Sequence, residues 1–148
     1  MSKTLPFAAT HHVRDHCLCL HAQRAARALA RHYDQALKPV GLTSGQFSLL
    51  MSLNRPQPAS LGQVATLLAM DRTTLTANLK PLERDGLVET RTSEEDRRAR
   101  LLHLTPAGRA RLARALPIWE RVHARLEASL SATSPDAVRA ALNVLASS

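Results

Sequence analysis

Aromatic side chains are scarce in this sequence and make up 3% of its 148 residues. All-β sandwiches and barrels draw on aromatic and β-branched side chains, so this scarcity argues against that class. Leu, Ala and Val must then supply most of the core, which favours helices. The length suits one domain with a sizeable core and is too short for two, and an apolar content of 45% argues against disorder.

The sequence also has few cysteines and no long apolar run. Two cysteines, Cys17 and Cys19, are too few for a disulfide-rich secreted scaffold. No apolar stretch approaches the length that spans a bilayer, and the N-terminus lacks the basic-then-apolar pattern of a signal peptide. We therefore expect a soluble cytoplasmic protein with no membrane partner.

Acidic residues are outnumbered by basic ones, 12 to 20, which gives a formal net charge of +8. Such an excess attracts polyanions, and the guanidinium group of arginine, the commoner basic residue here, can pair with phosphate or guanine through two hydrogen bonds. A basic protein from an arginine-rich proteome would show the same balance. A nucleic-acid partner therefore needs support from the motifs.

Helical spacing of apolar residues and capping patterns predict four helices, a β-hairpin and two more helices, in that order. Thr43 with Gln46, and Ser60 with Gln63, have the spacing of capping boxes. The expected helices cover residues 12–38, 43–53, 60–68, 71–85, 105–130 and 134 onward; the expected strands cover 87–91 and 100–104, and residues 1–11 are expected to form a loose arm.

Two of the short helices form the pattern of a winged helix-turn-helix. They are joined by a tight turn at residues 69–71, and the hairpin follows the second of them. We expect a mainly α fold with a small β-hairpin, a winged helix-turn-helix with N- and C-terminal dimerisation helices. Its parts are an arm and dimerisation helix in residues 1–41, a DNA-binding lobe in 42–105 and dimerisation helices in 106–148, within one compact domain.

The second helix of this motif has a small, polar and basic outer face. Leu75, Leu79 and Leu82 lie together at helical spacing, so the other side points outward. The candidate DNA contacts there are Arg72, Thr73, Thr74, Thr76, Ala77 and Lys80, with Arg84 further along. Thr can bond to base edges, Ala permits close approach, and Lys and Arg reach phosphates. A plain solvated face is the alternative, although threonine is a poor helix former.

The predicted hairpin loop, Ser93–Arg98, contains charges of both signs. Such a loop is usually a solvated turn. Beside a recognition helix, however, Arg97 or Arg98 can enter a minor groove while Asp96 holds the guanidinium group through a forked ion pair.

From Leu42 to Gly108 the chain resembles the multiple-antibiotic-resistance-regulator (MarR) family. The motifs are residues 75–82 leading into Glu83–Arg84–Asp85–Gly86–Leu87–Val88, then Asp96–Arg97–Arg98, then Leu104–Thr105–Pro106–Ala107–Gly108. The resemblance implies a symmetric dimer with interleaved terminal helices, a palindromic operator, and repression of a nearby gene. It also implies that Arg98 is the wing-tip arginine in the minor groove and that Asp96 supports it.

One position departs from the family pattern. Pro81 lies inside the predicted recognition helix and cannot donate to the Ala77 carbonyl, and an interior proline costs about 3 kcal/mol. The helix can kink or loosen there, which bears on Lys80 and Arg84 as contacts.

The first helix and the last two helices carry more apolar residues than a small core can cover. Helical spacing links Leu112, Leu116, Trp119, Val122 and Leu126, and also Val138, Leu142 and Leu145. Exposed stripes of that length usually pair with a partner chain, so the residues themselves predict a homodimer. Pro117 should bend the long helix.

The segment His16–His21 holds both cysteines between histidines. Cysteine and histidine at close spacing can bind zinc or a metalloid, and thiols can be oxidised. On a helix Cys17 and Cys19 would point about 200° apart, whereas Cys17 and His21 would share a face. Alternatively, the cysteines are small core side chains and the histidines lie on the surface.

The family resemblance implies another trigger, a small aromatic acid or phenol held between the dimerisation helices and the DNA-binding lobe. Phe47, Met51 and Met70 can line such a pocket, with His or Arg of the first helix facing a carboxylate. Core packing explains the same residues. The expected function is a repressor released from its operator by this ligand, and thiol oxidation or metal binding at Cys17 and Cys19 is the alternative trigger.

The sequence argues against two other classes of protein, an interaction module and an enzyme. A winged helix can bind a protein partner, but the basic face with small residues argues against that use. No nucleophile–base–acid set, phosphate-binding glycine loop or dense metal motif occurs in the sequence. We therefore expect neither an enzyme nor a cofactor.

Overall fold

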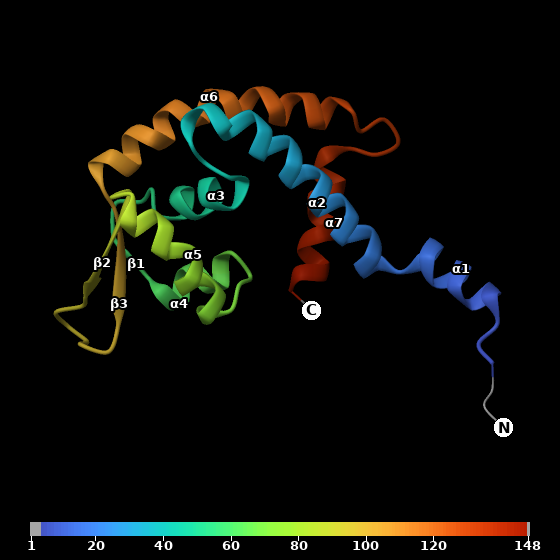
Figure 1. Cartoon of the computed structure of the whole chain (residues 1–148), viewed down its shortest axis with the longest axis horizontal. Helices are drawn as coiled ribbons and strands as arrows, with labels where there is room; N and C mark the ends of the chain where they lie inside the picture. The colour runs from blue at the N-terminus through green and yellow to red at the C-terminus, as the bar shows by residue number, and fades with distance from the viewer. Residues whose placement is uncertain (1–3, 148) are drawn as a thin grey trace.

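The computed structural model describes residues 4–147 (Figure 1). Its elements in chain order are α1 (Phe7–His16), α2 (Leu18–Leu37), η1 (Lys38–Val40), α3 (Ser44–Ser52), β1 (Ala59–Ser60), α4 (Leu61–Leu67), α5 (Arg72–Arg84), β2 (Val88–Thr92), β3 (Arg100–Leu104), α6 (Pro106–Ala128) and α7 (Pro135–Ala146). The predicted mainly α fold with a small sheet is confirmed. Within residues 4–147, no helix is both long enough and apolar enough to cross a membrane.

The three strands form one antiparallel sheet in the order β1–β3–β2. β2 and β3 are the predicted hairpin, with Val88 opposite Leu104. The sequence patterns do not predict β1, which pairs with β3 through Ala59 and Leu102. The expectation of two strands was therefore incomplete, because a strand of two residues is too short to show alternation.

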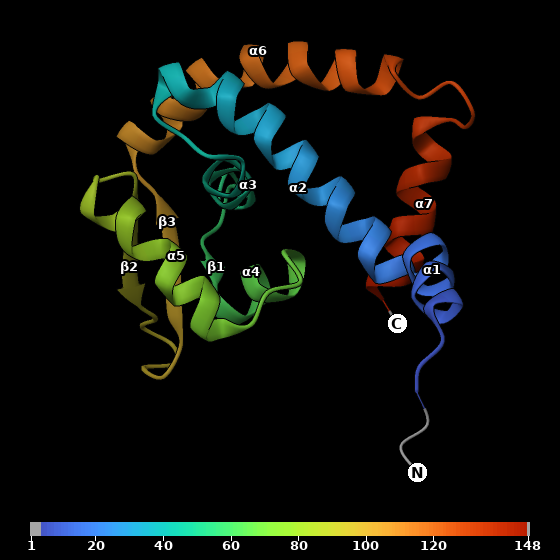
Figure 2. The same cartoon turned by 45° about the vertical axis from the view of Figure 1, so that its right-hand side comes forward.

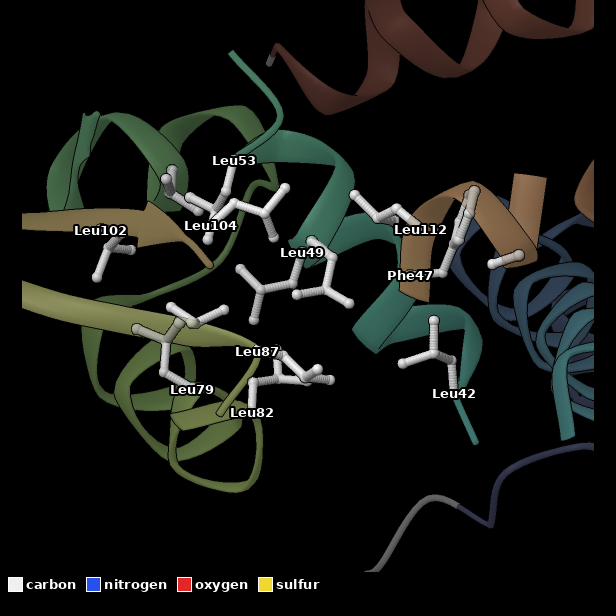
Figure 3. Close-up of a cluster of buried hydrophobic side chains, with 14 of the residues drawn as sticks. Leu42, Phe47, Leu49, Leu53, Leu79, Leu82, Leu87, Leu102, Leu104 and Leu112 are labelled. Carbon is white, nitrogen blue, oxygen red and sulfur yellow. The ribbon is translucent and has the colours of Figure 1, made fainter. Parts of the chain in front are cut away.

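A leucine-rich core lies between the sheet, α3, α5 and the first half of α6 (Figure 3). Leu75, Leu79 and Leu82, the predicted inner face of α5, are 0%, 3% and 1% exposed. Burying a leucine side chain contributes about 1.5–3 kcal/mol relative to leaving it in water. These three residues therefore fix which face of α5 points outward.

The helices α3 to α7 begin at the predicted caps. Thr43 with Gln46 and Ser60 with Gln63 form complete capping boxes, which confirms both patterns. Side-chain oxygens also accept backbone N–H groups at the starts of α5, α6 and α7, from Asp71, Thr105 and Ser134. These caps place the start of α5 directly after the turn that joins it to α4.

Gly108 lets the start of α6 approach the sheet closely. A Cβ atom at this position would overlap the carbonyl oxygen of Leu87 and lie 2.7 Å from Cδ1 of Leu104. The same carbonyl accepts the backbone N–H of Thr105 at 3.1 Å. Because residue 108 has no side chain, the start of α6 can pack directly against the base of the hairpin.

The N-terminal segment corrects the prediction of a loose arm over residues 1–11. Residues 7–16 form α1, which follows Pro6 at φ −68°. Ring contacts join successive turns, at 4.3 Å between Phe7 and His11 and 4.5 Å between His12 and His16. Such contacts four residues apart support a helix without any burial, so apolar periodicity does not reveal them. Residues 1–3 of the predicted arm lie outside the described residues.

The predicted single helix over residues 12–38 is also wrong in one respect. Cys17, with an extended ψ of 112°, separates α1 from α2. Its backbone N–H still donates to the Val13 carbonyl at 2.9 Å, and its own carbonyl accepts from the N–H of His21 at 3.1 Å. The interruption is therefore confined to one residue.

Two prolines lie inside helices without ending them, Pro81 in α5 and Pro117 in α6. The sequence indicated that the helix can kink or loosen at Pro81, but α5 remains one helix from Arg72 to Arg84. Leu79 and Leu82, on either side of Pro81, are buried and hold this segment against the core. α6 follows a curved path above the lobe (Figure 1).

The terminal helices extend away from the lobe. α2 packs against α6, and α1, the first half of α2, and α7 lie to one side of the sheet and α5 (Figures 1 and 2). No residue of α1 or α7, both of which lie wholly in the described part of the chain, is buried. Leu18 and Leu29 of α2 and Leu142 and Leu145 of α7 are exposed, so apolar surface collects on this side.

Candidate nucleic-acid interface

The turn between α4 and α5 sets the angle of the helix-turn-helix. Ala69 has φ +52°, the left-handed conformation. Its N–H donates to the Thr66 carbonyl at 3.2 Å, and the N–H of Met70 donates to the Ala65 carbonyl at 2.9 Å. This pair of bonds is a Schellman motif, in which glycine is the usual left-handed residue.

Asp71 then caps α5 with both carboxylate oxygens. One accepts the backbone N–H of Thr74 and the other its hydroxyl group, each at 2.8 Å. The backbone hydrogen bond and then the hydroxyl bond from Thr74 lower the pKa of Asp71 from its usual value. The carboxylate therefore stays ionised at neutral pH and holds the first turn of α5 in place.

The predicted DNA-contact residues of α5 all lie on its exposed side. They are Arg72, Thr73, Thr74, Thr76, Ala77 and Lys80. Two hydroxyl groups already donate within the helix, Thr74 to Asp71 and Thr76 to the Arg72 carbonyl at 2.8 Å. These hydroxyl oxygens can still accept. The hydroxyl group of Thr73 makes no hydrogen bond within residues 4–147, so it can both donate and accept.

The wing is the loop at residues 93–99 between β2 and β3. The N–H of Ser93 donates to the Ala99 carbonyl, and the N–H of Ala99 donates to the Asp96 carbonyl, both at 2.9 Å. These bonds close the loop and leave Arg97 and Arg98 exposed at its tip.

Asp96 corrects the predicted ion pair. Its carboxylate accepts the backbone N–H of Arg98 at 3.0 Å instead of bonding to a guanidinium group. Within residues 4–147, neither Arg97 nor Arg98 takes part in an ion pair. Asp96 therefore shapes the loop backbone, and both arginine side chains can turn toward a ligand.

Two residues near this surface were not singled out from the sequence. Gly62 and Arg100 line a hollow of about 380 Å³ together with Arg72, Asp96 and Arg98. The sequence does show a glycine at the second position of a predicted helix. Its relation to Arg72 and the wing can be recognised only in the folded chain, where α4 lies beside the start of α5.

A second hollow, of about 430 Å³, lies between α3, the end of α4 and α6, and its lining is mostly apolar. It is lined by Phe47, Ser48, Met51, Ser52, Leu67, Leu68, Leu116 and Trp119. The predicted pocket residues Phe47 and Met51 are present, whereas Met70 does not line it. The sulfur of Met70 instead accepts from the Asn78 amide at 3.5 Å.

Trp119 also lines this hollow, although the sequence analysis assigned it only to the apolar stripe that predicts a dimer. Its ring stacks on His123 at 4.4 Å, and Nε2 of His123 lies 2.8 Å from a carboxylate oxygen of Glu127. Glu127 also pairs with Arg139 of α7 at 3.0 Å. A continuous set of contacts therefore runs from the pocket wall along α6 to α7.

The cysteine and histidine segment does not form the predicted side-chain pair. Cys17 is outside the helix, so the argument from helical angles does not apply to it. Nδ1 of His21 lies 2.7 Å from the Cys17 carbonyl oxygen, and both thiols are free, half-buried at Cys17 and exposed at Cys19. Among residues 4–147, no three His, Cys, Asp or Glu side chains are grouped to hold a metal ion.

Comparison with known proteins identifies the family. Residues 42–99 match the sequence model of the MarR family. The structure is similar to that of the M. tuberculosis transcriptional regulator MosR in complex with DNA, with 38% identity, a TM-score of 0.82, and coverage of 89% of this chain and 95% of that chain. The chain belongs to the MarR family.

Other MarR-like relatives extend the comparison. The transcriptional repressor CouR bound to a 23-mer DNA duplex is 32% identical, with a TM-score of 0.74 and 98% of both chains covered. CouR bound to p-coumaroyl-CoA is also 32% identical, with a TM-score of 0.76 and 87% of this chain and 91% of that chain covered. The activatory protein BadR of Rhodopseudomonas palustris is 37% identical over 89 residues, 58% of this chain; the match spans about half of BadR, 51% of its length.

Proposed function

We propose that this MarR-family chain is a DNA-binding transcriptional regulator that contacts its operator through α5 and the wing. The observation that carries the proposal is the exposed, small and basic face of α5 beside two unpaired arginines, Arg97 and Arg98, within the described residues. The side of α5 formed by Leu75, Leu79 and Leu82 is buried, so this face is available to a major groove. The structures of MosR and CouR in complex with DNA support the assignment, because this chain matches nearly the whole length of each protein.

The regulator acts as a homodimer on a palindromic operator. The exposed leucines of α2 and α7 supply apolar surface that a second copy of the chain would cover. A twofold axis then presents two α5 helices and two wings to the duplex, with half-sites about 34–36 Å apart on one face.

The proposed control is repression relieved by a small aromatic ligand in the hollow lined by Phe47, Met51 and Trp119. Its mostly apolar walls and the Trp119 ring suit an aromatic group. CouR, named as a repressor and also known in complex with p-coumaroyl-CoA, supports this choice of ligand class. A second trigger, oxidation of a thiol, is favoured by the exposure of Cys19.

Selection of bound duplexes from a random double-stranded DNA library tests the proposal. The purified protein should enrich a palindromic sequence, and this operator should shift in a native gel at moderate salt when a scrambled duplex does not. Adding phenolic acids or their CoA thioesters should release the operator. Hydroperoxide is added in a parallel experiment to test oxidation of a thiol, and the Cys19→Ser variant is its control. Failure to enrich any sequence would remove the regulator assignment.

A further inference from the structure

The hollow of about 380 Å³ beside the wing gathers positive charge from three elements. Arg72 comes from α5, Arg98 from the wing and Arg100 from β3, and Asp96 supplies a single carboxylate. That carboxylate accepts the backbone N–H of Arg98. Within residues 4–147, none of the three arginines takes part in an ion pair. Guanidinium groups that share a hollow repel one another, and an anion bound between them relieves that repulsion.

Gly62 provides the space in which Arg72 lies. A Cβ atom on Gly62 would stand 2.9 Å from Nη2 and 3.7 Å from Cζ of Arg72. Residue 62 is the second residue of α4 and has no positive φ, so the backbone itself does not require glycine. Glycine generally weakens a helix relative to alanine. Its use here is therefore explained by the guanidinium group that lies over it.

We propose that Gly62 positions Arg72, and that Arg72 and Arg100 together bind one phosphodiester group of the DNA backbone in this hollow. The inference rests on the proposed function and adds a site to it. Arg72 belongs to the recognition helix and Arg100 to the root of the wing, so a shared phosphate fixes the two elements in one register on the same strand. Phosphate contacts position a protein on DNA without reading its sequence.

Gly62→Ala tests the positioning role, because the added methyl group meets only the flexible end of Arg72. The variant should keep or raise the thermal unfolding midpoint and bind the selected operator about fivefold more weakly or worse. Its plot of log K against log salt should be shallower by about two for a dimer that loses one phosphate contact in each protomer. An affinity and salt slope equal to those of the wild type would overturn the role of Gly62.

Gly45→Ala is the matched control. Gly45 is the second residue of α3 and, like Gly62, lies within a capping box, but a Cβ atom there would lie 4.0 Å from its nearest atom, Oγ1 of Thr43. This variant should bind the operator as the wild type does. A loss equal to that of Gly62→Ala would show that the effect comes from the helix start in general and would overturn the inference.

A double-mutant cycle shows whether Gly62 acts through Arg72. In an Arg72→Ala background, Gly62→Ala should cause no further loss of affinity. Arg100→Ala, which does not alter α4, should weaken the operator and a scrambled duplex by the same factor and also flatten the salt dependence. An unchanged slope in Arg100→Ala would overturn the phosphate assignment while the operator selection still stands. If the wild type binds no duplex, the proposed function fails together with this site.

Discussion

At the scale of single residues, the proposed role of the wing depends on the side chain of Arg98, which makes no ion pair within residues 4–147. Arg98 is exposed, and its backbone N–H donates to Asp96. Its guanidinium group is therefore free to reach a minor groove or a phosphate without breaking an internal contact.

Arg98→Ala should weaken operator binding by about 1–3 kcal/mol and leave the unfolding midpoint unchanged. Fluorescence anisotropy with the selected operator measures the first effect and thermal unfolding the second. Arg109→Ala removes the same charge at the start of α6, at the end of the hairpin opposite the wing, and should bind normally. Equal affinities of the Arg98 variant and the wild type would remove the wing from the interface.

Gly108 is a residue whose missing side chain matters to stability. Gly108→Ala should lower the free energy of unfolding by about 1–3 kcal/mol, because the methyl group overlaps the rigid Leu87 carbonyl. Chemical denaturation provides the measurement. The same substitution at Gly45, where the nearest atom is 4.0 Å away, should cost nothing, and a similar loss there would contradict the steric explanation.

Ala69 is the opposite case, a residue with a side chain where glycine fits better. Its φ of +52° is disfavoured by the Cβ atom, so Ala69→Gly should raise the free energy of unfolding by about 0.5–1 kcal/mol. Ala77→Gly on the exposed face of α5 should instead lower it by about 1 kcal/mol. Denaturant titration of both variants gives the comparison, and a loss of stability in Ala69→Gly would contradict the strain.

At the scale of elements, the lobe was the most predictable part of the chain. The periodic leucines and the caps at Thr43, Ser60 and Asp71 are local signals that the tertiary structure reinforces, so they predicted α3, α4 and α5 correctly. The elements that the sequence did not predict leave no apolar periodicity: α1 is supported by ring contacts without burial, and β1 is very short. β1 has two residues and exists because β3 offers it a partner.

The candidate site shows the same limit. The outward residues of α5 could be read from spacing, because helical geometry decides which side faces the core. Those of the wing could be read from a charged loop between two alternating segments. The bond from Asp96 to a backbone N–H, and the position of Arg72 over Gly62, depend on distances that no sequence pattern encodes. The break at Cys17 likewise altered the geometry expected for the two cysteines.

At the scale of the whole molecule, α1 and α7 have little to hold them within one chain, since no residue of either helix, both within the described part of the chain, is buried. α7 contacts α6 through the ion pair between Arg139 and Glu127, and this contact chain begins at Trp119 in the pocket wall. Exposed ion pairs contribute little to stability. The apolar side of α7 is therefore the surface that the proposed dimer would cover.

Leu142→Asp should convert the proposed dimer to monomers at micromolar concentration, because it places a charge on that apolar side. Sedimentation equilibrium measures the change, and the circular dichroism spectrum of the variant should still show a folded, mainly α-helical protein. Asn143→Asp adds the same charge at the neighbouring position of α7 and should remain dimeric. A dimer in the Leu142 variant would place the interface elsewhere.

The lack of any buried residue in α7, over the described residues 135–146, has a consequence for how much protein the cell must make. If pairing supplies the free energy that orders α7, that helix becomes ordered only above the concentration at which two copies meet. Dilution would then loosen α7 and separate the two recognition helices in the same step. The abundance of the protein would thus set its occupancy of DNA more steeply than the affinity of a single lobe does.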